Sequence, residues 1–422
     1  MIRKISMRLR AVLFIALCSV SSQAAAQDIP PREILDKIIP QLSKPLPPAK
    51  ISFRPTAGAG ADDGCRMQNF EMVLARENGS AANKYSVLLN RQAEGAVRPR
   101  QLLAVINSLH VDADGNERTY HPEDPYGEGV CEQRADANGK IKWQGVCALD
   151  TLNPSGIRVF VEDKRARLVD RNKPPKDAVS LADRWKEIWP LIRDRTLKAF
   201  DLKTVAPHAP DGYNLFYWKE KKLTVLTKRA IIPSSKDGYP CVRGAESRYP
   251  GYFVSITTLM RPGPVRPDGC EPQSSLDAAE VPFFVLPGGD FGQIQIGDIV
   301  IGRLKTPEGE HVAFGIAGDA GPIEQFGEAS IAFHLALRGK PDMPIMNVRD
   351  VDALDIDGDF LKREKASLAI LVLGGTKKRL AGDYSRENIE KIGREELASW
   401  NGGNERLTER LNACAAKATP VR

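Results

Sequence analysis

Short apolar runs recur along most of this chain, and each is bounded by glycine, proline or aspartate. Such runs are typical of β-strands, and turn residues at close intervals between them favour a barrel or a sandwich. The sequence therefore predicts a mainly β fold of the α+β class. The expected strands lie within residues 85–90, 103–111, 158–163, 215–218, 222–232, 251–260, 281–287, 297–304, 311–317 and 366–375.

Fewer segments have the period of an amphipathic helix. They are charged on one side and apolar on the other, and two of them follow one another near the end of the chain. We therefore expect peripheral helices around the β core and a C-terminal helical segment. The expected helices are residues 32–42, 180–200, 329–337, 385–400 and 404–417.

The first 26 residues have the layout of a secretory signal peptide. A basic start is followed by an apolar stretch too short to span a bilayer, and then by small residues. We expect cleavage near Ala26 and a protein that is exported to the periplasm or secreted. Residues 27–60 form a Pro/Ala-rich N-terminal segment, and residues 61–418 are expected to be one domain.

The charge of the chain depends strongly on this first segment. The whole sequence carries a formal net charge of +6, and four of its basic residues lie in 1–26, so the remainder carries about +2. A nearly neutral chain without a basic block is not typical of a nucleic-acid-binding protein. No later segment is long and apolar enough to span a membrane, so we expect no stable membrane insertion.

Six cysteines follow the leader segment, and an even number in an exported chain predicts disulfides. Six cysteines allow fifteen pairings. We favour the one with two short loops, which leaves the outermost cysteines to join the ends of the domain. A zinc site is the alternative, but no C-x-x-C pair is present and no histidine lies at ligand spacing, so we expect no metal. The favoured pairs are Cys131–Cys147, Cys241–Cys270 and Cys65–Cys414.

Two acids near the C-terminal third are separated from other charges in the sequence. Asp319 ends an apolar run and Glu328 precedes another, and each follows a glycine that would let a second chain approach closely. We expect Asp319 at a strand end and Glu328 at a helix start, facing each other. Two carboxylates in unequal environments suit the hydrolysis of a glycosidic bond, which needs one protonated and one ionised group. The alternative is structural: a turn cap and a helix N-terminal charge.

The segment "AFGIAGDAGPIEQFGEASIA" resembles the signature of family-75 glycoside hydrolases, the fungal-type chitosanases and their bacterial relatives. Further stretches agree in order, among them "INSLHVDADGNERTYHPED", "PGYFVSITTL", "VPFFVLPGG" and "IQIGDIVIG", and together they span about residues 100–375. Phe326 and His334 stand where the family usually has other residues. Residues 150–210 are long for the family and indicate an insertion.

The resemblance implies that residues 61–418 are a chitosanase-like catalytic domain with Asp319 and Glu328 as its catalytic pair. It implies inversion at the anomeric carbon, with Glu328 as general acid and Asp319 as the base that activates water. No cofactor is implied. The arrangement of the motif is also similar to that of double-psi β-barrels, and this analogy is the basis for expecting such a core.

Four further residues are candidates for binding the substrate. Acids along a groove would attract the ammonium groups of chitosan, so Asp112 and Asp114 are expected near the cleft; a plain β-turn is the alternative. Tyr120 has a ring that suits stacking on a sugar. His121 is a further candidate, with a buried structural role as its alternative.

We expect Glu328, next to Phe326 and an apolar helix, to be the more desolvated acid and therefore the protonated one. Asp319, in a glycine-rich turn with free backbone N–H groups, should stay ionised. The first hypothesis is thus an exported, endo-acting hydrolase of chitosan-like polysaccharides. A peptidoglycan-acting enzyme and a non-catalytic glycan-binding barrel are the alternatives.

Overall fold

The computed structural model of the chain leaves the signal-like segment, Cys131, Cys147 and most of the helix expected over 180–200 outside its described part. The residues it describes are 33, 35–37, 50–56, 65, 67–75, 83–90, 99–121, 132–135, 138–139, 141–144, 157–162, 165–170, 199–201, 214–219, 222–227, 232–233, 235, 241–261, 270, 275–321, 325–345, 350–351, 353–400 and 409–418.

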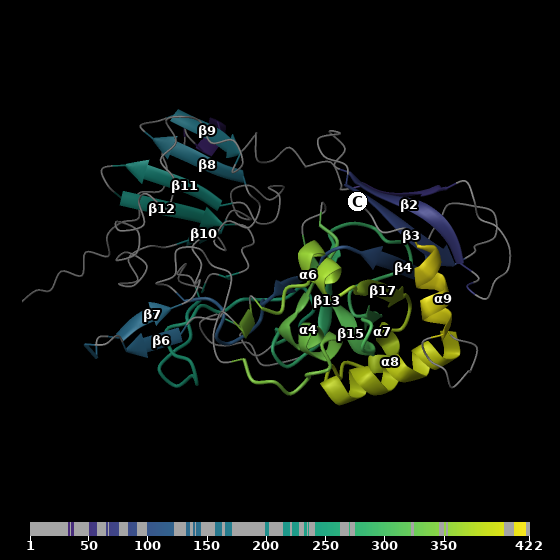
Figure 1. Ribbon diagram of the computed structural model, residues 1–422. Helices are drawn as coiled ribbons and strands as arrows, with labels where there is room; N and C mark the ends of the chain where they lie inside the picture. Colours follow the sequence, from purple (N-terminus) through teal and green to yellow (C-terminus); the bar gives the residue numbers. More distant parts are fainter. Residues whose placement is uncertain are drawn as a thin grey trace, which may run out of the picture.

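The longest apolar runs pair into one ten-stranded mixed sheet (Figure 1). Most neighbours in it are antiparallel, but β13–β15 and β16–β5 are parallel. Its strands, in spatial order, are β1 (Lys50–Pro55), β2 (Met67–Ala75), β3 (Asn83–Asn90), β4 (Gln101–Ile106), β17 (Ser367–Leu373), β14 (Ile299–Lys305), β15 (Glu310–Gly321), β13 (Phe283–Pro287), β16 (Glu328–Ser330) and β5 (His110–Asp112).

Two smaller sheets accompany the main one. A two-stranded hairpin pairs β6 (Glu132–Ala135) with β7 (Ile141–Gln144). A five-stranded sheet takes strands from the expected insertion at 150–210 and from the residues after it, and Figure 1 shows it apart from the main sheet. Its order is β10 (Ala199–Asp201), β12 (Lys222–Thr227), β11 (Asn214–Lys219), β8 (Ile157–Glu162) and β9 (Arg165–Asp170).

Five helices with described bounds pack around the main sheet or close its connections, and residues 33 and 35–37, within the helix expected over 32–42, are helical as well, as are 350–351. The two longest, at the C-terminus, confirm the expected helical segment, and in Figure 1 they lie along one side of the sheet. None of the helices in the described ranges is long and apolar enough to cross a bilayer. The helices are α4 (Ile331–Leu337), α6 (Gly358–Arg363), α7 (Lys377–Leu380), α8 (Arg386–Trp400) and α9 (Glu409–Lys417).

The main sheet is apolar on both faces, which explains why its central strands read as continuous hydrophobic runs. One face, which we call the Val285 face, carries Phe283, Val285 and Ile316 and is covered by residues of α8 and α9. The other, the Phe284 face, carries Phe284 and Leu286 and is covered by α4, and the same apolar cluster continues over alternate residues of β2 to β4.

Small residues let the helices approach this sheet. A side chain at Gly302 or Gly315 would meet the ring of Phe333 from α4 at 2.7 Å, and one at Gly393 of α8 would meet Phe314 at 2.6 Å. On both faces, therefore, a glycine makes room for an aromatic ring.

The α+β class is confirmed, and most expected strands are present. The run at 251–260 is an exception, because it forms only isolated bridges. Its backbone instead bonds to loops and to β15, as when the N–H of Leu259 donates to Gly318 O. Missed strands include β1, which lies at the end of the segment expected to be a Pro/Ala-rich linker, and β2. The sheet order runs from β1 to β5 without a pairing that closes it among the described strands, so a double-psi barrel is not confirmed.

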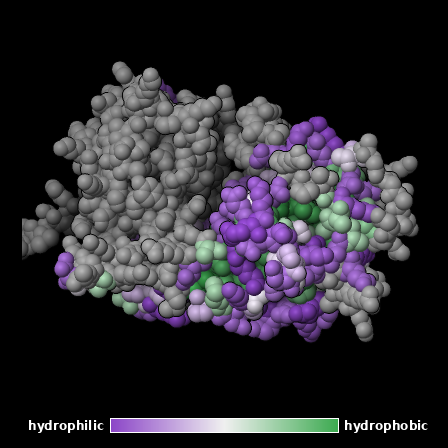
Figure 2. Space-filling view, in the orientation of Figure 1, coloured by the Kyte–Doolittle hydropathy of each residue, from purple (hydrophilic) through white to green (hydrophobic). Residues whose placement is uncertain are grey.

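The surface visible in Figure 2 is mostly hydrophilic where the chain is described, with small separate apolar patches. Met260 is the one large hydrophobic side chain of the described part that counts as exposed, at 39%. Such a surface is ordinary for a protein in water.

Candidate active site

Asp319 lies near the end of β15, as expected, and a β-bulge determines which way it points. Phe284 pairs with Ala317, but Val285 pairs with Asp319, so Gly318 is an extra residue in β15. Bulges of this kind are rare between parallel strands and redirect a side chain. If Gly318 itself paired with Val285, Asp319 would pair with Leu286 and lie on the Phe284 face. Because Gly318 is bulged, Asp319 pairs with Val285 and shares its face.

Glu328 is the first residue of β16 and pairs with Val285 from the other side. The expectation that it begins a helix is wrong in detail: α4 begins at Ile331, and its N-cap is Ser330, whose hydroxyl accepts from the N–H of Phe333. Glu328 therefore belongs to the sheet and lies two residues before the N-cap of α4.

The two acids flank the same residue, and this fixes their relation. Directly paired residues share a face of a sheet, and neighbouring strands lie about 4.8 Å apart, so the Cα atoms of Asp319 and Glu328 are about 10 Å apart across β13. Glu328 leans toward β15, because its Oε2 is 3.1 Å from where a Cβ of Gly321 would stand. Gly321 is two residues along the strand from Asp319, a step of about 7 Å.

The glycines before the two acids do what the sequence indicated. A Cβ at Gly318 would stand 2.5 Å from the Cβ of Phe283, and one at Gly327 would stand 2.7 Å from the carbonyl oxygen of Ser108. Gly327 also has a φ of +136°, which favours glycine. Both acids are thus held where another segment passes closely.

The carboxylate of Asp319 is buried, and one of its oxygens collects several donors. Oδ1 accepts hydrogen bonds from the N–H of Thr258 at 2.9 Å, from its hydroxyl at 2.5 Å, and from the N–H of Ala320 at 2.7 Å. The expected glycine-rich turn is therefore replaced by a strand, and the donors come chiefly from a distant segment. These bonds stabilise the ionised carboxylate.

Glu328 is half-buried beside polar and apolar neighbours, whereas Asp319 is buried, so the expectation that Glu328 is the more desolvated acid is wrong. Its Oε1 accepts a hydrogen bond from Nε2 of Gln325 at 2.7 Å. Phe326 is buried and packs edge-on against Phe284 and Tyr85, at ring separations of 5.3 and 5.6 Å. The apolar neighbour expected from the sequence is therefore present, but it packs into the Phe284 side of the core.

Asp112 and Asp114 are brought to Asp319 by the turn after β5. Each of the three offers a carboxylate oxygen, and these oxygens lie within 4.8 Å of one another. The turn is fixed from within, because the N–H of Asp114 donates to Asp112 Oδ1 at 2.8 Å. It also fits tightly against the core: Gly115 has a φ of +77°, and a side chain there would overlap the backbone of Leu276.

This clustering overturns the idea that Asp319 and Glu328 are kept away from other charges. They are isolated in sequence, yet in space Asp112 feels the negative charges of Asp114, Asp319 and Glu328. Burial, followed by these charges, raises the pKa of Asp112 well above its usual range. The site therefore holds four acids, and the pKa of Asp112 among them is raised.

By spacing alone, the oxygens of Asp112, Asp114 and Asp319 suit either a hard cation or a shared proton. The raised pKa of Asp112 follows from burial and the neighbouring acids alone, and either a cation or a proton would offset the clustered negative charge.

Tyr120 and His121 lie close by but are only 4% and 5% exposed. The hydroxyl of Tyr120 donates to Asp114 Oδ1 at 2.5 Å, so the ring supports the acidic turn. His121 packs edge-on to Tyr252 at 4.9 Å, and burial lowers its pKa to about 3. Neither ring offers an open face for a sugar, which favours the structural reading of both residues.

Two of the three expected disulfides are present. Cys65 is bonded to Cys414 and Cys241 to Cys270. The first joins the start of the main sheet to α9. The second closes the segment that carries Thr258 to the site. The Cys131–Cys147 pair lies outside the described residues.

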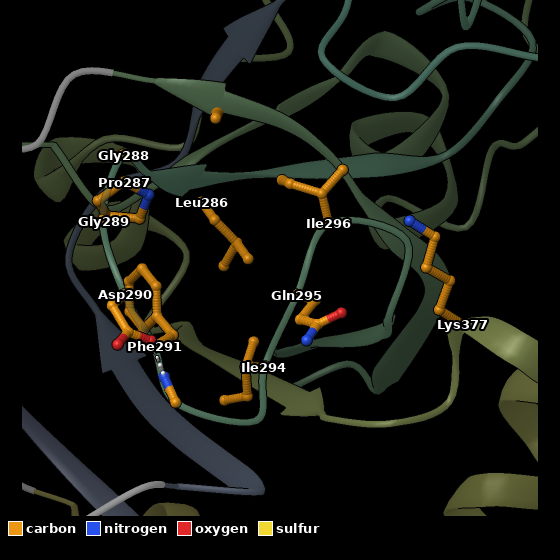
Figure 3. A pocket seen from close by; sticks show the side chains of 12 residues that line it. Leu286, Pro287, Gly288, Gly289, Asp290, Phe291, Ile294, Gln295, Ile296 and Lys377 are labelled. Carbon is orange, nitrogen blue, oxygen red and sulfur yellow. Dashed lines mark hydrogen bonds between the residues drawn. The ribbon is translucent and has the colours of Figure 1, made fainter.

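A cavity of about 380 Å³ adjoins the site at the end of β13 (Figure 3). Ala320, the neighbour of Asp319, lines it together with the loop after β13. Figure 3 shows Asp290 and Lys377 on opposite sides of it. Because Ala320 points to the opposite face from Asp319, backbone separates the cavity from the carboxylates.

Sequence reasoning missed the residues that act on the two acids. Thr258 is 61 positions from Asp319, and although it lies in the stretch "PGYFVSITTL", nothing in that stretch points to Asp319. Gln325 lies only three residues before Glu328, so their side-chain hydrogen bond could have been predicted from the sequence. Gly321 follows Asp319 by two, the strand period that puts both on one face.

The comparisons with known proteins identify no relative of this chain. No family model matches the chain, and no curated protein matches it.

Proposed function

We propose that this protein is an exported, endo-acting glycoside hydrolase that cleaves β-1,4-linked glucosamine polymers with inversion. One observation carries the proposal: Asp319 and Glu328 flank Val285 on one face of the sheet. Inverting enzymes hold their two carboxyl groups about 6.5–9.5 Å apart, which leaves room for a water, whereas retaining enzymes hold them about 5–5.5 Å apart. Strand spacing puts the Cα atoms of the two residues about 10 Å apart, and Glu328 leans toward β15, so we expect the carboxyl groups to be closer than that, as inversion requires.

The proposed roles follow from the partners of each acid. Asp319, with its donors on Oδ1, is the base that takes a proton from water as the water oxygen bonds to the anomeric carbon. Glu328 gives its proton to the glycosidic oxygen as that bond breaks. The side-chain amide of Gln325 has both a donor and an acceptor, so it can hold Glu328 before and after this transfer.

The acidic cluster supports a cationic substrate. Asp112 and Asp114 lie beside Asp319, and a glucosamine unit carries an ammonium group that such a cluster attracts. The two disulfides fit an oxidising compartment, as export would require. The double-psi barrel core remains part of this proposal by analogy.

An assay on soluble chitosan, with product sizing and NMR of the anomeric protons, tests the reaction directly. We expect oligosaccharides of intermediate length from early times and α-anomers as first products. Purified peptidoglycan measured alongside tests the alternative substrate. Release from peptidoglycan alone would move the proposal to cell-wall glycans, and β-anomers would overturn inversion.

Asp319→Asn and Glu328→Gln should each fold normally but lose chitosan hydrolysis by several orders of magnitude. General acid–base assistance alone contributes about 10²- to 10⁴-fold. Thermal unfolding and kcat/KM are the measurements, with the exposed acids Asp359→Asn and Glu308→Gln as matched controls. A loss under about tenfold in either folded variant would favour structural acids and a non-catalytic glycan-binding protein.

A further inference from the structure

The segment 251–260, expected as a strand, instead lies across the bulge in β15. The N–H of Leu259 donates to Gly318 O at 2.9 Å, and Gly318 is the extra residue of the bulge. Thr258 precedes Leu259, and both its backbone N–H and its hydroxyl donate to Asp319 Oδ1. The Thr258 hydroxyl also accepts from the N–H of Ala320 at 3.2 Å. Thr258 is thereby bonded to Asp319 and to the residue after it.

Asp319 needs such donors because its surroundings are negative. Asp112 and Asp114 each place an oxygen within 4.8 Å of it, and it is only 8% exposed. Glu328 adds a fourth carboxyl group to the same electrostatic environment. Burial and like charges both favour protonation, so a carboxylate that must accept a proton during turnover has to be stabilised as the ion by hydrogen bonds.

We propose that Thr258 is a positioning residue for the hydrolysis: it fixes the plane of the Asp319 carboxylate and keeps Asp319, beside Asp112, as the ionised member of the cluster. This inference rests on the proposed function. Its hydroxyl donates its proton to Oδ1 throughout, and the proton taken from water goes to the Asp319 carboxylate, not to Thr258.

Thr258→Val removes the hydroxyl and keeps both the β-branched shape and the backbone N–H. A hydrogen bond to a charged group corresponds to about 10- to 100-fold in rate, and we expect kcat on chitosan to fall by that factor with KM unchanged. The acid limb of the pH profile of kcat/KM should move to higher pH, because the ion has lost a donor. Thr258→Ser keeps the hydroxyl and should recover most of kcat. Wild-type kcat and an unmoved acid limb in Thr258→Val would overturn the proposal.

Thr257→Val is the matched control. Thr257 is the buried neighbour, and its hydroxyl donates to Leu259 O and accepts from the N–H of Leu276, without touching Asp319. This variant should unfold at a lower temperature and leave the acid limb in place. If Thr257→Val moved the acid limb as far as Thr258→Val does, disturbance of the segment would explain both effects, and the proposal would fail.

A second measurement needs no turnover. The ¹³C resonance of the Asp319 carboxyl group, assigned with Asp319→Asn, reports its titration directly. Thr258→Val should raise its midpoint by about one pH unit, and Thr258→Ser should not. An unmoved midpoint would overturn the role of Thr258 whatever the activity. A moved midpoint in a protein that cleaves no glycan would instead overturn the hydrolase function.

Discussion

At the scale of the residue, the orientation of Glu328 depends on a missing side chain. Glu328 reaches over Gly321 of the facing strand, and a methyl group there would stand 3.1 Å from its Oε2 and 2.9 Å from Cγ1 of Val285. Both contacts are tighter than ordinary van der Waals packing. The carboxyl group can therefore lean toward β15 only because position 321 is a glycine.

Gly321→Ala should consequently lower activity more than stability. The added methyl pushes Glu328 away from Asp319, and a misplacement of about 1 Å in a reacting group can cost about 100-fold in rate. Gly358→Ala is the control, because nothing lies within 4 Å of its added Cβ and alanine is the better helix former there. The measurements are kcat on chitosan and the thermal unfolding of both variants. Equal kcat in both would contradict the idea that Glu328 leans over Gly321 toward Asp319.

At the scale of the element, the two disulfides hold different parts of the molecule. Cys241–Cys270 closes a span of 29 residues that contains Thr258, whereas Cys65–Cys414 closes a span of 349 residues and ties α9 to the sheet. In the chain-entropy account a longer closed loop restricts the unfolded chain more. The longer span should therefore matter more for global stability, and the shorter one for the site.

Replacing each pair by serine separates these effects. Cys241→Ser with Cys270→Ser should lower the free energy of unfolding by about 3–4 kcal/mol and reduce kcat, since Thr258 is less firmly held. Cys65→Ser with Cys414→Ser should cost about 5–6 kcal/mol but leave kcat intact wherever the protein stays folded. Urea unfolding and kcat at low urea measure both. A larger loss of kcat in the Cys65/Cys414 variant than in the Cys241/Cys270 variant would contradict the link between the short loop and the site.

The strands of the core were predictable from the sequence, because an apolar run such as 299–304 needs only its own residues to indicate a strand. The position of Asp319 near a strand end, and the close approach at Gly318 and Gly327, were readable for the same reason, whereas Glu328 was expected at a helix start and instead begins β16. Asp112 and Asp114 were expected near the cleft, but their clustering with the Asp319 carboxylate was not, because Asp112 reaches it only through the pairing of β5 with β16, two distant parts of the chain.

At the scale of the whole molecule, buried histidines couple stability to pH. Burial lowers the pKa of His121 to about 3 and that of His334 to about 4, and Nε2 of His334 lies 3.1 Å from His110 O. An unfolded chain titrates its histidines near 6.5. Below that pH the unfolded state binds protons that the folded state does not, so stability falls as the pH drops toward 3–4.

The acid Asp277 acts in the opposite sense. Burial is the main cause that raises its pKa to about 6, so the folded state holds this proton at a pH where the unfolded chain releases it. The contribution of Asp277 to the free energy of unfolding therefore rises as the pH falls from 6 toward 4. The effect of the histidines on the pH dependence of stability is therefore measured by comparing variants, because the wild-type curve also contains the effect of Asp277.

His121→Phe should flatten the loss of stability between pH 6 and pH 4, by up to about 1.4 kcal/mol per pH unit. Phenylalanine keeps the ring beside Tyr252 and cannot be protonated. Urea unfolding across this range measures the slope, and His311→Phe, at an exposed histidine, is the control. An unchanged slope in His121→Phe would show that His121 is accessible to protons in the folded state.

The bulge at Gly318 also bears on chains of a different length at this point. Ala317 and Asp319 are two residues apart yet lie on opposite faces, because Gly318 is the extra residue of the bulge. Deleting Gly318 would leave Ala317 opposite Phe284 and Asp319 opposite Val285, so regular alternation alone would then bring the acid to the face of Glu328. Among diverged copies of this protein, one that has lost the residue at 318 should therefore still carry its acid on that face.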